Sequence, residues 1–212
     1  LNLELSSPLP GTTIRYTTNA TSNNPTWRTY TNPIRIDETT RVTARLEQPG
    51  KEPGPLRDRT FIKLASNMQN VSSPLPLIII DSFRRNIDAE SSSNSQNPKR
   101  PVHGIFIDVA PDSGVARPTD LPDFEGRGGM RVRGQTSSGF PKKQYSFETW
   151  TSEGDDKDVS IFGFSEESDW VIHAPYSDKT LVRNALSYGL GSLISEAYQP
   201  GTRFVELILN DR

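Results

Sequence analysis

Short segments of alternating polar and apolar residues, separated by proline and glycine, constrain most strongly how this chain can fold. The 212 residues include 17 prolines and 15 glycines, which interrupt helices and mark turns. The alternation has a period of two over residues 13–17, 34–36 and 40–46. In a strand, this period places every second side chain on the same face of a sheet. The sequence therefore favours strands and turns over helices.

These alternating segments predict a small antiparallel β-module over residues 1–65. A linker is expected over residues 66–75, followed by a second part over residues 76–212. Apolar runs of strand length at 77–81 and 104–109 are expected to be neighbours in one sheet of this second part.

Two aspartates at the ends of these runs and the polar stretch between the runs also carry predictions. Asp81 and Asp108 lie near strand ends, where turn capping is the favoured role and metal binding the alternative. The stretch 86–100 is poor in apolar residues and rich in Ser and Asn, which predicts a mobile insertion.

Two polar segments carry the candidate chemistry. Residues 131–145 combine arginines, glycine, hydroxyls and a lysine pair, which supply positive charge and N–H donors for an oligophosphate. Residues 169–184 end in a lysine, an arginine and an asparagine that share one helix face if 179–188 is helical. An ordinary basic loop followed by an ordinary helix is the alternative interpretation. The candidate phosphate ligands are Arg131, Arg133, Ser137, Ser138, Lys142, Lys143, Asp178, Lys179, Arg183 and Asn184.

Strand alternation predicts which way the two arginines point. Over residues 130–133, Met130 and Val132 share one face and Arg131 and Arg133 share the other. Both arginines are therefore expected on the same side of the sheet.

The lysine pair is harder to orient. Alternation over 142–148 directs Tyr145 and Phe147 inward, and Lys143 shares their face while Lys142 points the opposite way. A bulge after Pro141 would exchange the two lysines. Either lysine therefore remains a candidate for the phosphate contact, and a solvated strand edge is the alternative.

An apolar stripe at helical spacing predicts a helix from residue 178 towards 196. Ser177 or Asp178 is the expected N-cap, with free N–H groups and the positive dipole end facing a phosphate. Arg183 and Asn184 lie beside or opposite the stripe, where they contact a ligand or form a structural pair with Glu206 or Asp169. The stripe consists of Leu181, Ala185, Leu186, Leu190, Leu193 and Ile194.

A series of spaced motifs marks the run from about Leu75 to the C-terminus. The motifs are Arg133-Gly134, Ser137-Ser138, Phe140-Pro-Lys-Lys143, Asp169-Trp170, Ala174-Pro-Tyr-Ser-Asp-Lys179, Arg183-Asn184 and Arg203-Phe-Val-Glu206. This run resembles the amino-terminal half of the CotH kinase family, the secreted kinases related to spore coat protein H. The resemblance implies ATP binding with Mg²⁺ or Mn²⁺ and phosphorylation of Ser or Thr on extracellular or coat proteins.

The family pattern continues beyond these motifs through a Gly-x-Tyr-x-Gly-like strand and a second half that bears the catalytic and metal-binding aspartates. No segment here matches those parts, so the catalytic residues are expected beyond Arg212 and no metal ligand is assigned. The apolar pattern Phe204 to Leu209 is expected to end without a partner, which favours a fragment over a degenerate, non-catalytic relative. The chain alone is expected to bind nucleotide weakly and to transfer no phosphate.

The first part of the chain carries its own set of motifs. They are Tyr16 to Thr26, Tyr30, Asn32-Pro-Ile34 and Thr40-Arg-Val-Thr-Ala44. They resemble the Ig-like module at the C-terminus of chitobiases and hexosaminidases, although Asn19-Ala-Thr21 replaces its Asp-Gly-Ser turn. The resemblance implies a spacer, with glycan or cell-surface contact as the alternative. The expected fold class is α+β: a small antiparallel β-sandwich, then part of an atypical protein-kinase-like fold with a mixed sheet and a helix.

Composition limits the remaining function classes. The net charge of −2 gives no general attraction to nucleic acid. The absence of cysteine excludes disulfides and thiolate metal sites and fits a cytosolic or an exported bacterial protein. No apolar stretch approaches the roughly 20 residues of a membrane span.

Two function classes follow. The first is a secreted or cell-surface bacterial kinase that acts on Ser/Thr-rich protein substrates, with its export signal outside this chain. The second is a non-catalytic surface, coat or adhesion protein that uses the same domains for binding.

Overall fold

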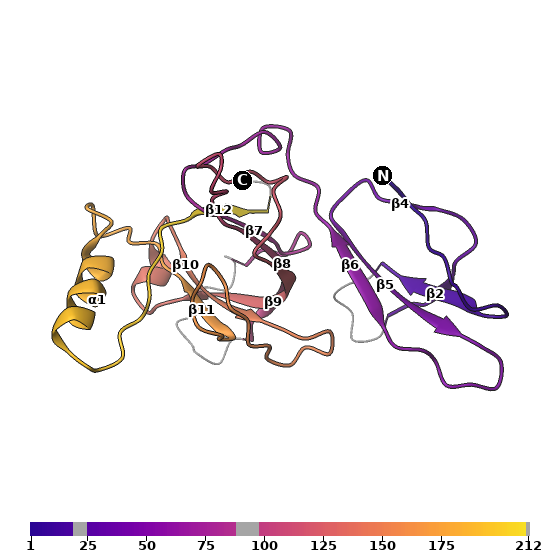
Figure 1. The fold of residues 1–212 in the computed structure, drawn as a ribbon. Helices are drawn as coiled ribbons and strands as arrows, with labels where there is room; N and C mark the ends of the chain where they lie inside the picture. Colours follow the sequence, from indigo (N-terminus) through magenta and orange to yellow (C-terminus); the bar gives the residue numbers. More distant parts are fainter. Residues whose placement is uncertain (19–24, 88–97, 211–212) are drawn as a thin grey trace. The chain divides into compact units, whose positions relative to one another are not determined.

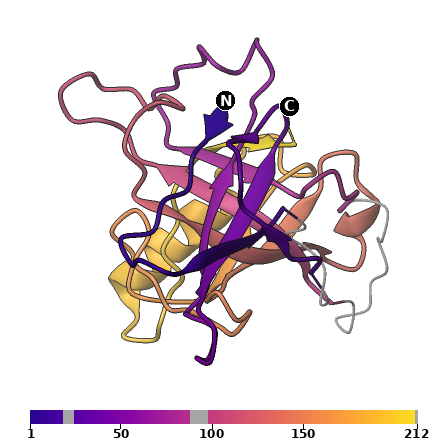
Figure 2. The ribbon, with the colours of Figure 1, turned by 90° about the vertical axis from the view of Figure 1, so that its right-hand side faces the viewer.

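The computed structural model describes residues 1–18, 25–87 and 98–210. The Asn19-Ala-Thr21 turn and most of the polar stretch 86–100 lie outside these ranges, as does the chain end at 211–212. The described residues divide into two units, Leu1–Ala65 and Ser66–Asn210, which are drawn in Figure 1 and, after a quarter turn, in Figure 2. Residues 66–75 are part of the second unit, where Ser73 forms a β-bridge with Ala116.

The first unit consists of a four-stranded and a two-stranded antiparallel sheet. Its small core contains Ile34, Ile36 and Val42, with Tyr16 and Tyr30 packed against them. The strands predicted at 13–17, 34–36 and 40–46 are confirmed to within one residue. The strands are β1 (Asn2–Leu3), β2 (Thr13–Thr17), β3 (Arg28–Thr29), β4 (Ile34–Arg35), β5 (Thr40–Glu47) and β6 (Arg57–Phe61), in sheets ordered β1-β4 and β3-β2-β5-β6.

The second unit is built on a six-stranded mixed sheet with the order β11-β10-β9-β8-β7-β12. All neighbours are antiparallel except β12, which runs parallel to β7. A mixed sheet with a helix is therefore confirmed for this unit. The elements are β7 (Leu77–Asp81), β8 (Arg100–Ile107), β9 (Phe124–Arg133), the 3₁₀ turn η2 (Ser137–Gly139), β10 (Gln144–Thr149), β11 (Asp169–Ile172), α1 (Arg183–Ile194) and β12 (Glu206–Leu209).

Strand β7 is buried along its whole length, which explains why its sequence does not alternate. It pairs with β8, so the predicted neighbourhood of the two apolar runs is confirmed. Asp81, at the end of β7, accepts a hydrogen bond from the Phe83 N–H at 2.7 Å. Asp108 accepts one from the Val109 N–H and pairs with Arg203 at 2.5 Å. Asp81 therefore stabilises the turn beside it, whereas Asp108 also forms an ion pair with a residue distant in sequence.

The prediction that the apolar run ending at Leu209 lacks a partner is wrong. Strand β12 pairs with β7 from Glu206 opposite Leu77 to Leu209 opposite Ile80. Strand β7 thus has β8 on one edge and β12 on the other. A parallel pairing between segments this far apart in sequence leaves no local pattern that could predict it.

The glycines of β9 allow aromatic rings to lie against its backbone. A Cβ at Gly128 would overlap the Phe147 ring, and a Cβ at Gly129 would overlap the Trp150 ring. The glycine-rich stretch is therefore a strand interior that packs closely on both faces.

The predicted helix start is wrong. Helix α1 begins at Arg183, and Leu181 before it has a left-handed backbone (φ 63°). Asp178 accepts hydrogen bonds from Thr180 and from the Arg183 N–H, and these bonds stabilise a turn where the stripe had predicted helix. Lys179 consequently does not share a helix face with Arg183 and Asn184.

Candidate functional site

Three strands of the second unit place their neighbouring ends at one end of the sheet. In the registers of β10 with its two neighbours, Gln144 lies opposite Arg133 and Tyr145 lies opposite Ile172. The loop from β9 to β10 and the segment from β11 to α1 therefore begin side by side. Figure 1 shows this end of the sheet next to α1.

The predicted faces of Met130–Arg133 in β9 are confirmed. Met130 and Val132 are buried in the core, Arg131 is half-buried on the opposite face, and Arg133 is exposed there. Arg133 forms no hydrogen bond or ion pair with any of the residues that the structure describes. Its guanidinium is therefore available to an incoming anion.

The two lysines have different surroundings. The Lys143 ammonium, which is half-buried, donates a hydrogen bond to the Ser138 carbonyl oxygen. Ser138 is itself buried, and its hydroxyl donates to the Gln135 carbonyl at 2.7 Å. Lys142 is exposed and, within the described ranges, has no hydrogen bond or ion pair. Lys143 and Ser138 thus hold the loop together, while the charge of Lys142 faces solvent.

The sharp bend after β9 depends on Gly134. Its φ of 92° lies in the region that favours glycine, and a Cβ at this position would overlap the Ser137 hydroxyl. That hydroxyl accepts a hydrogen bond from the Gln144 side-chain amide. The bend therefore brings Ser137 back onto the start of β10.

His173 connects this loop to helix α1. Its Nδ1 lies 3.0 Å from Gln144 Oε1, and its Nε2 lies 3.4 Å from Asn184 Nδ2. Partial burial lowers the pKa of His173, the positive charge of Arg133 lowers it further, and Asp178 opposes both. Neither Gln144 nor His173 is among the candidate ligands that the sequence predicted. The signal for Gln144 was its register opposite Arg133, which depends on knowing where the strands pair.

Asp178 organises the segment before α1. It accepts hydrogen bonds from the Thr180 hydroxyl at 2.6 Å and the Arg183 N–H at 3.0 Å, and these bonds lower the pKa of its carboxyl group. The Arg183 Nε lies 3.3 Å from the same carboxylate. Arg183 therefore pairs with Asp178, where the sequence had suggested Glu206 or Asp169.

Aromatic contacts also join the two polar segments. The rings of Phe140 and Tyr176 are 5.4 Å apart. The Lys179 ammonium lies 4.3 Å from the Tyr176 ring centre and donates to the Tyr176 carbonyl oxygen at 2.8 Å. Lys179 is thus held by its own loop, whereas Asn184 contacts His173 and the charges of Arg133 and Asp178 act on its pKa.

At the far end of β10, an ion-pair cluster occupies the same face. The Lys99 ammonium contacts Glu148 and lies 2.7 Å from Asp169. Burial lowers the pKa of Lys99, but its bonds to Asp169 and Glu148 outweigh that effect, and the net shift is upward. Asp169, part of a motif that the sequence singled out, therefore has a structural partner.

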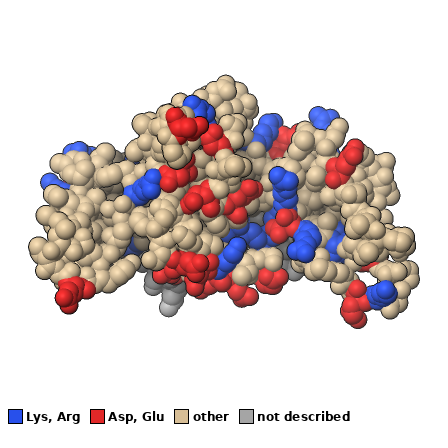
Figure 3. Space-filling model, viewed as in Figure 1, with Lys and Arg blue, Asp and Glu red and all other residues tan. Residues whose placement is uncertain are grey.

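The described residues contain no group of three or more His, Asp or Glu side chains placed to hold a metal ion. Their one α-helix, α1, is too short and too polar to cross a membrane. Figure 3 shows acidic and basic side chains interspersed on the face in view, while the surface around α1 at the left is mostly uncharged. Any attraction of phosphate to Arg133 and Lys142 is therefore local.

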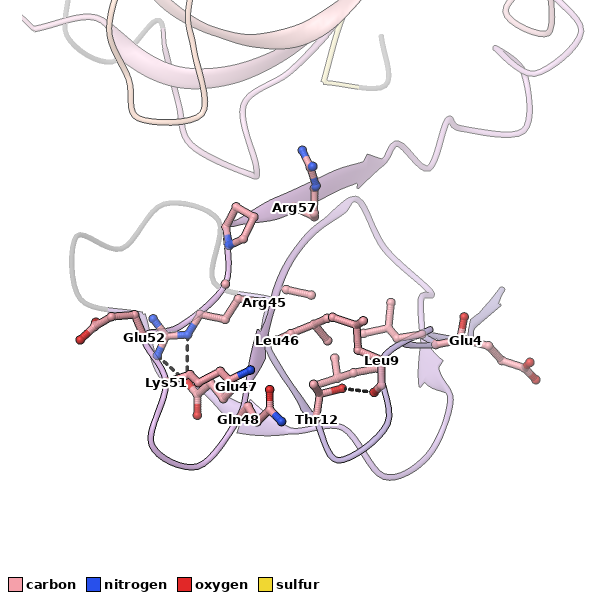
Figure 4. Close-up of a pocket in the computed structure, with 16 residues that line it drawn as sticks. Glu4, Leu9, Thr12, Arg45, Leu46, Glu47, Gln48, Lys51, Glu52 and Arg57 are labelled. Carbon is pink, nitrogen blue, oxygen red and sulfur yellow. Dashed lines mark hydrogen bonds and ion pairs between the residues drawn. The ribbon is translucent and has the colours of Figure 1, made fainter.

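A second candidate site lies within the first unit. A groove of about 490 Å³ has Leu5, Ile14 and Leu46 among its lining residues. Figure 4 shows Leu9 and Leu46 within it, and Glu4 and Glu52 at its two ends. Charged side chains, among them Arg45, Glu47 and Lys51, line it beside these aliphatic residues, and no aromatic residue is among the described residues that line it.

One segment of each unit matches a known protein family. Residues 130–212 match the family described as CotH kinase protein, and residues 1–56 match the chitobiase/beta-hexosaminidase C-terminal domain. Both resemblances inferred from the sequence are confirmed for these segments. The matched CotH segment begins within β9 and includes both polar segments. Searches of curated proteins and of solved structures found no match.

Proposed function

We propose that the second unit is the nucleotide-binding part of a CotH-like protein kinase, which transfers phosphate from ATP to Ser or Thr of extracellular or coat proteins. The supporting observation is the pair of basic side chains, Arg133 and Lys142, at the end of a hairpin that Gln144 and His173 connect to α1. Neither cation has an internal partner among the described residues. A location outside a bacterial cell and a Ser/Thr-rich substrate follow from the CotH resemblance alone.

The chemistry of these residues suits a phosphate chain. The Arg133 guanidinium offers paired N–H donors to two phosphate oxygens, and Lys142 offers a mobile point charge. Gly134 fixes the bend that directly follows Arg133. The first N–H of α1 donates to Asp178, so the helix start contributes less to phosphate binding than the sequence suggested.

The divalent ion that accompanies ATP bridges the phosphates and neutralises their charge in kinases. The described residues offer no group of three ligands for it. The part that we assign to this unit is therefore binding and charge neutralisation by arginine and lysine. We further propose that residues 1–212 alone bind ATP without transferring its phosphate, because Asp81, Asp108 and Asp178 all make internal contacts.

A second candidate function is non-catalytic binding to a coat or surface partner. The observation that favours it is the apolar side of α1, where Leu186, Leu193 and Ile194 are exposed. ATP binding discriminates the two proposals, because the binding function requires no phosphate contact at Arg133 and Lys142.

Single substitutions of the two lysines test the proposed function. We expect Lys142→Ala to weaken binding of ATP with Mg²⁺ about tenfold, since one charge-assisted contact contributes roughly 1.5–3 kcal/mol. Lys143→Ala should mainly reduce stability, because Lys143 holds the Ser138 carbonyl. Calorimetric titration and urea unfolding of both variants measure the two effects. Unchanged ATP affinity in the Lys142→Ala/Lys143→Ala double variant would contradict the proposal.

A further inference from the structure

The hydrogen bonds around His173 specify one form of its ring. The Gln144 amide nitrogen donates to the Ser137 hydroxyl, so the Gln144 carbonyl oxygen faces His173 Nδ1. A carbonyl oxygen only accepts, and Nδ1 must therefore carry a proton. On the other side of the ring, the Asn184 amide nitrogen faces Nε2 and donates to it. Two independent amides thus fix the neutral Nδ1–H tautomer.

The charges around the ring oppose protonation on one side and favour it on the other. Arg133 of β9 disfavours the imidazolium, and Asp178, from the loop before α1, favours it. The carboxylate of Asp178 is already shared with Arg183 of α1, the third charged group of this cluster. Gln144 of β10 and Asn184 of α1 are neutral. Desolvation is the larger cause of the lowered pKa of His173, and Arg133 is the charged neighbour whose compensation removes the electrostatic part.

We propose that His173 couples nucleotide binding to proton uptake: a phosphate that neutralises Arg133 allows His173 to become protonated and to add a further positive charge to the site. This inference rests on the proposed nucleotide function. On protonation, Nε2 becomes a donor, so the Asn184 amide must turn to present its oxygen. The proposed chemical change is the transfer of one proton from solvent to Nε2, and no other covalent bond is made or broken. By reciprocity, ATP should bind more tightly as the pH falls through the titration of His173.

The tautomer is tested without nucleotide. The chain has two histidines, so ¹⁵N-histidine NMR with a His173→Gln variant for assignment identifies its ring nitrogens. We expect the Nδ1–H form at neutral pH and a higher titration midpoint in Arg133→Ala. The Nε2–H form, or a midpoint that Arg133→Ala leaves unchanged, would overturn the inference whatever the nucleotide result.

The coupling is tested by calorimetric titration with ATP and Mg²⁺ near pH 6 in buffers of different ionisation enthalpy. The difference between the wild-type chain and His173→Gln removes the protons that ATP itself takes up. We expect net uptake of a fraction of a proton by the wild type relative to His173→Gln. Equal uptake with ATP bound would sink this inference alone, whereas absence of ATP binding to the wild type would also overturn the proposed function.

Discussion

At the scale of single residues, Gly134 fixes the geometry of the β9–β10 loop. Its positive φ and the Ser137 hydroxyl beside it leave no room for a side chain. We expect Gly134→Ala to lower the free energy of unfolding by about 1–3 kcal/mol, the usual effect of forcing a strained backbone. Urea unfolding measures it.

Gly139 in the same loop provides the matched control. A Cβ at Gly139 would meet no atom within 4 Å. Gly139→Ala should therefore change the free energy of unfolding far less. Equal effects of the two substitutions would show that the bend does not depend on Gly134.

His173 gives the protein a pH dependence of stability with a definite sign. Because its pKa is lowered on folding from the ordinary 6.5, the unfolded chain binds more protons in this range. The contribution of neutral His173 to the free energy of unfolding is therefore fully present above pH 6.5, and it is lost as the pH falls through the folded-state pKa of His173. Urea unfolding between pH 7.5 and pH 5 should show this loss in the wild type and a smaller one in His173→Gln. A wild type that becomes more stable over that range would contradict the assignment.

At the scale of elements, α1 has no buried residue, whereas strand β7 of the same unit is buried along its whole length. Leu193 and Ile194 are 80% and 84% exposed, although their spacing is that of a core-facing stripe. We expect Leu193→Gln to change the free energy of unfolding by no more than about 0.5 kcal/mol, as at other exposed positions.

The buried leucine of β7 is the comparison. Leu77 is 1% exposed, and Leu77→Ala should cost roughly 2–5 kcal/mol. Thermal or urea unfolding of the two variants measures both effects. A comparable loss in Leu193→Gln would show that the apolar side of α1 is covered in solution.

The elements also show which parts of the fold the sequence could predict. Strand β10 and the end of β9 over Met130–Arg133 follow from alternation, because buried residues there alternate with less buried ones. Strands β2 and β5 follow from the same period in the sequence, although their burial does not alternate. Strand β6 was missed because three of its five residues are charged. The helix start was misplaced because the Asp178 turn has the same apolar spacing as a helix. The partner of β12 depends on long-range pairing, which local patterns do not encode.

The candidate site was predictable to a similar extent. Arg133 and Lys142 follow from local alternation and motifs, and both are exposed as the site requires. The positions of Gln144 and His173 depend on the register of β9, β10 and β11, which determines which residues lie opposite one another. The residues of such a site can therefore be predicted from the sequence more readily than the residues that contact them.

At the scale of the whole molecule, two units with different family resemblances share one chain, and the net charge of −2 provides no general attraction for ATP. Binding must therefore depend on particular cations. Arg117 and Lys157 are exposed basic residues of the second unit outside the proposed site. They offer a control that removes the same charge elsewhere.

The most direct test is calorimetric titration of the 212-residue chain with ATP and Mg²⁺. The wild type is compared with Arg133→Ala/Lys142→Ala and with the charge-matched control Arg117→Ala/Lys157→Ala. We predict that the first double variant loses affinity at least about a hundredfold, because two charge-assisted contacts of roughly 1.5–3 kcal/mol each are removed. The control should retain wild-type affinity within about twofold, since only long-range charge, screened by salt, is altered. Equal affinities in all three proteins, or no binding to the wild type, would contradict the nucleotide site.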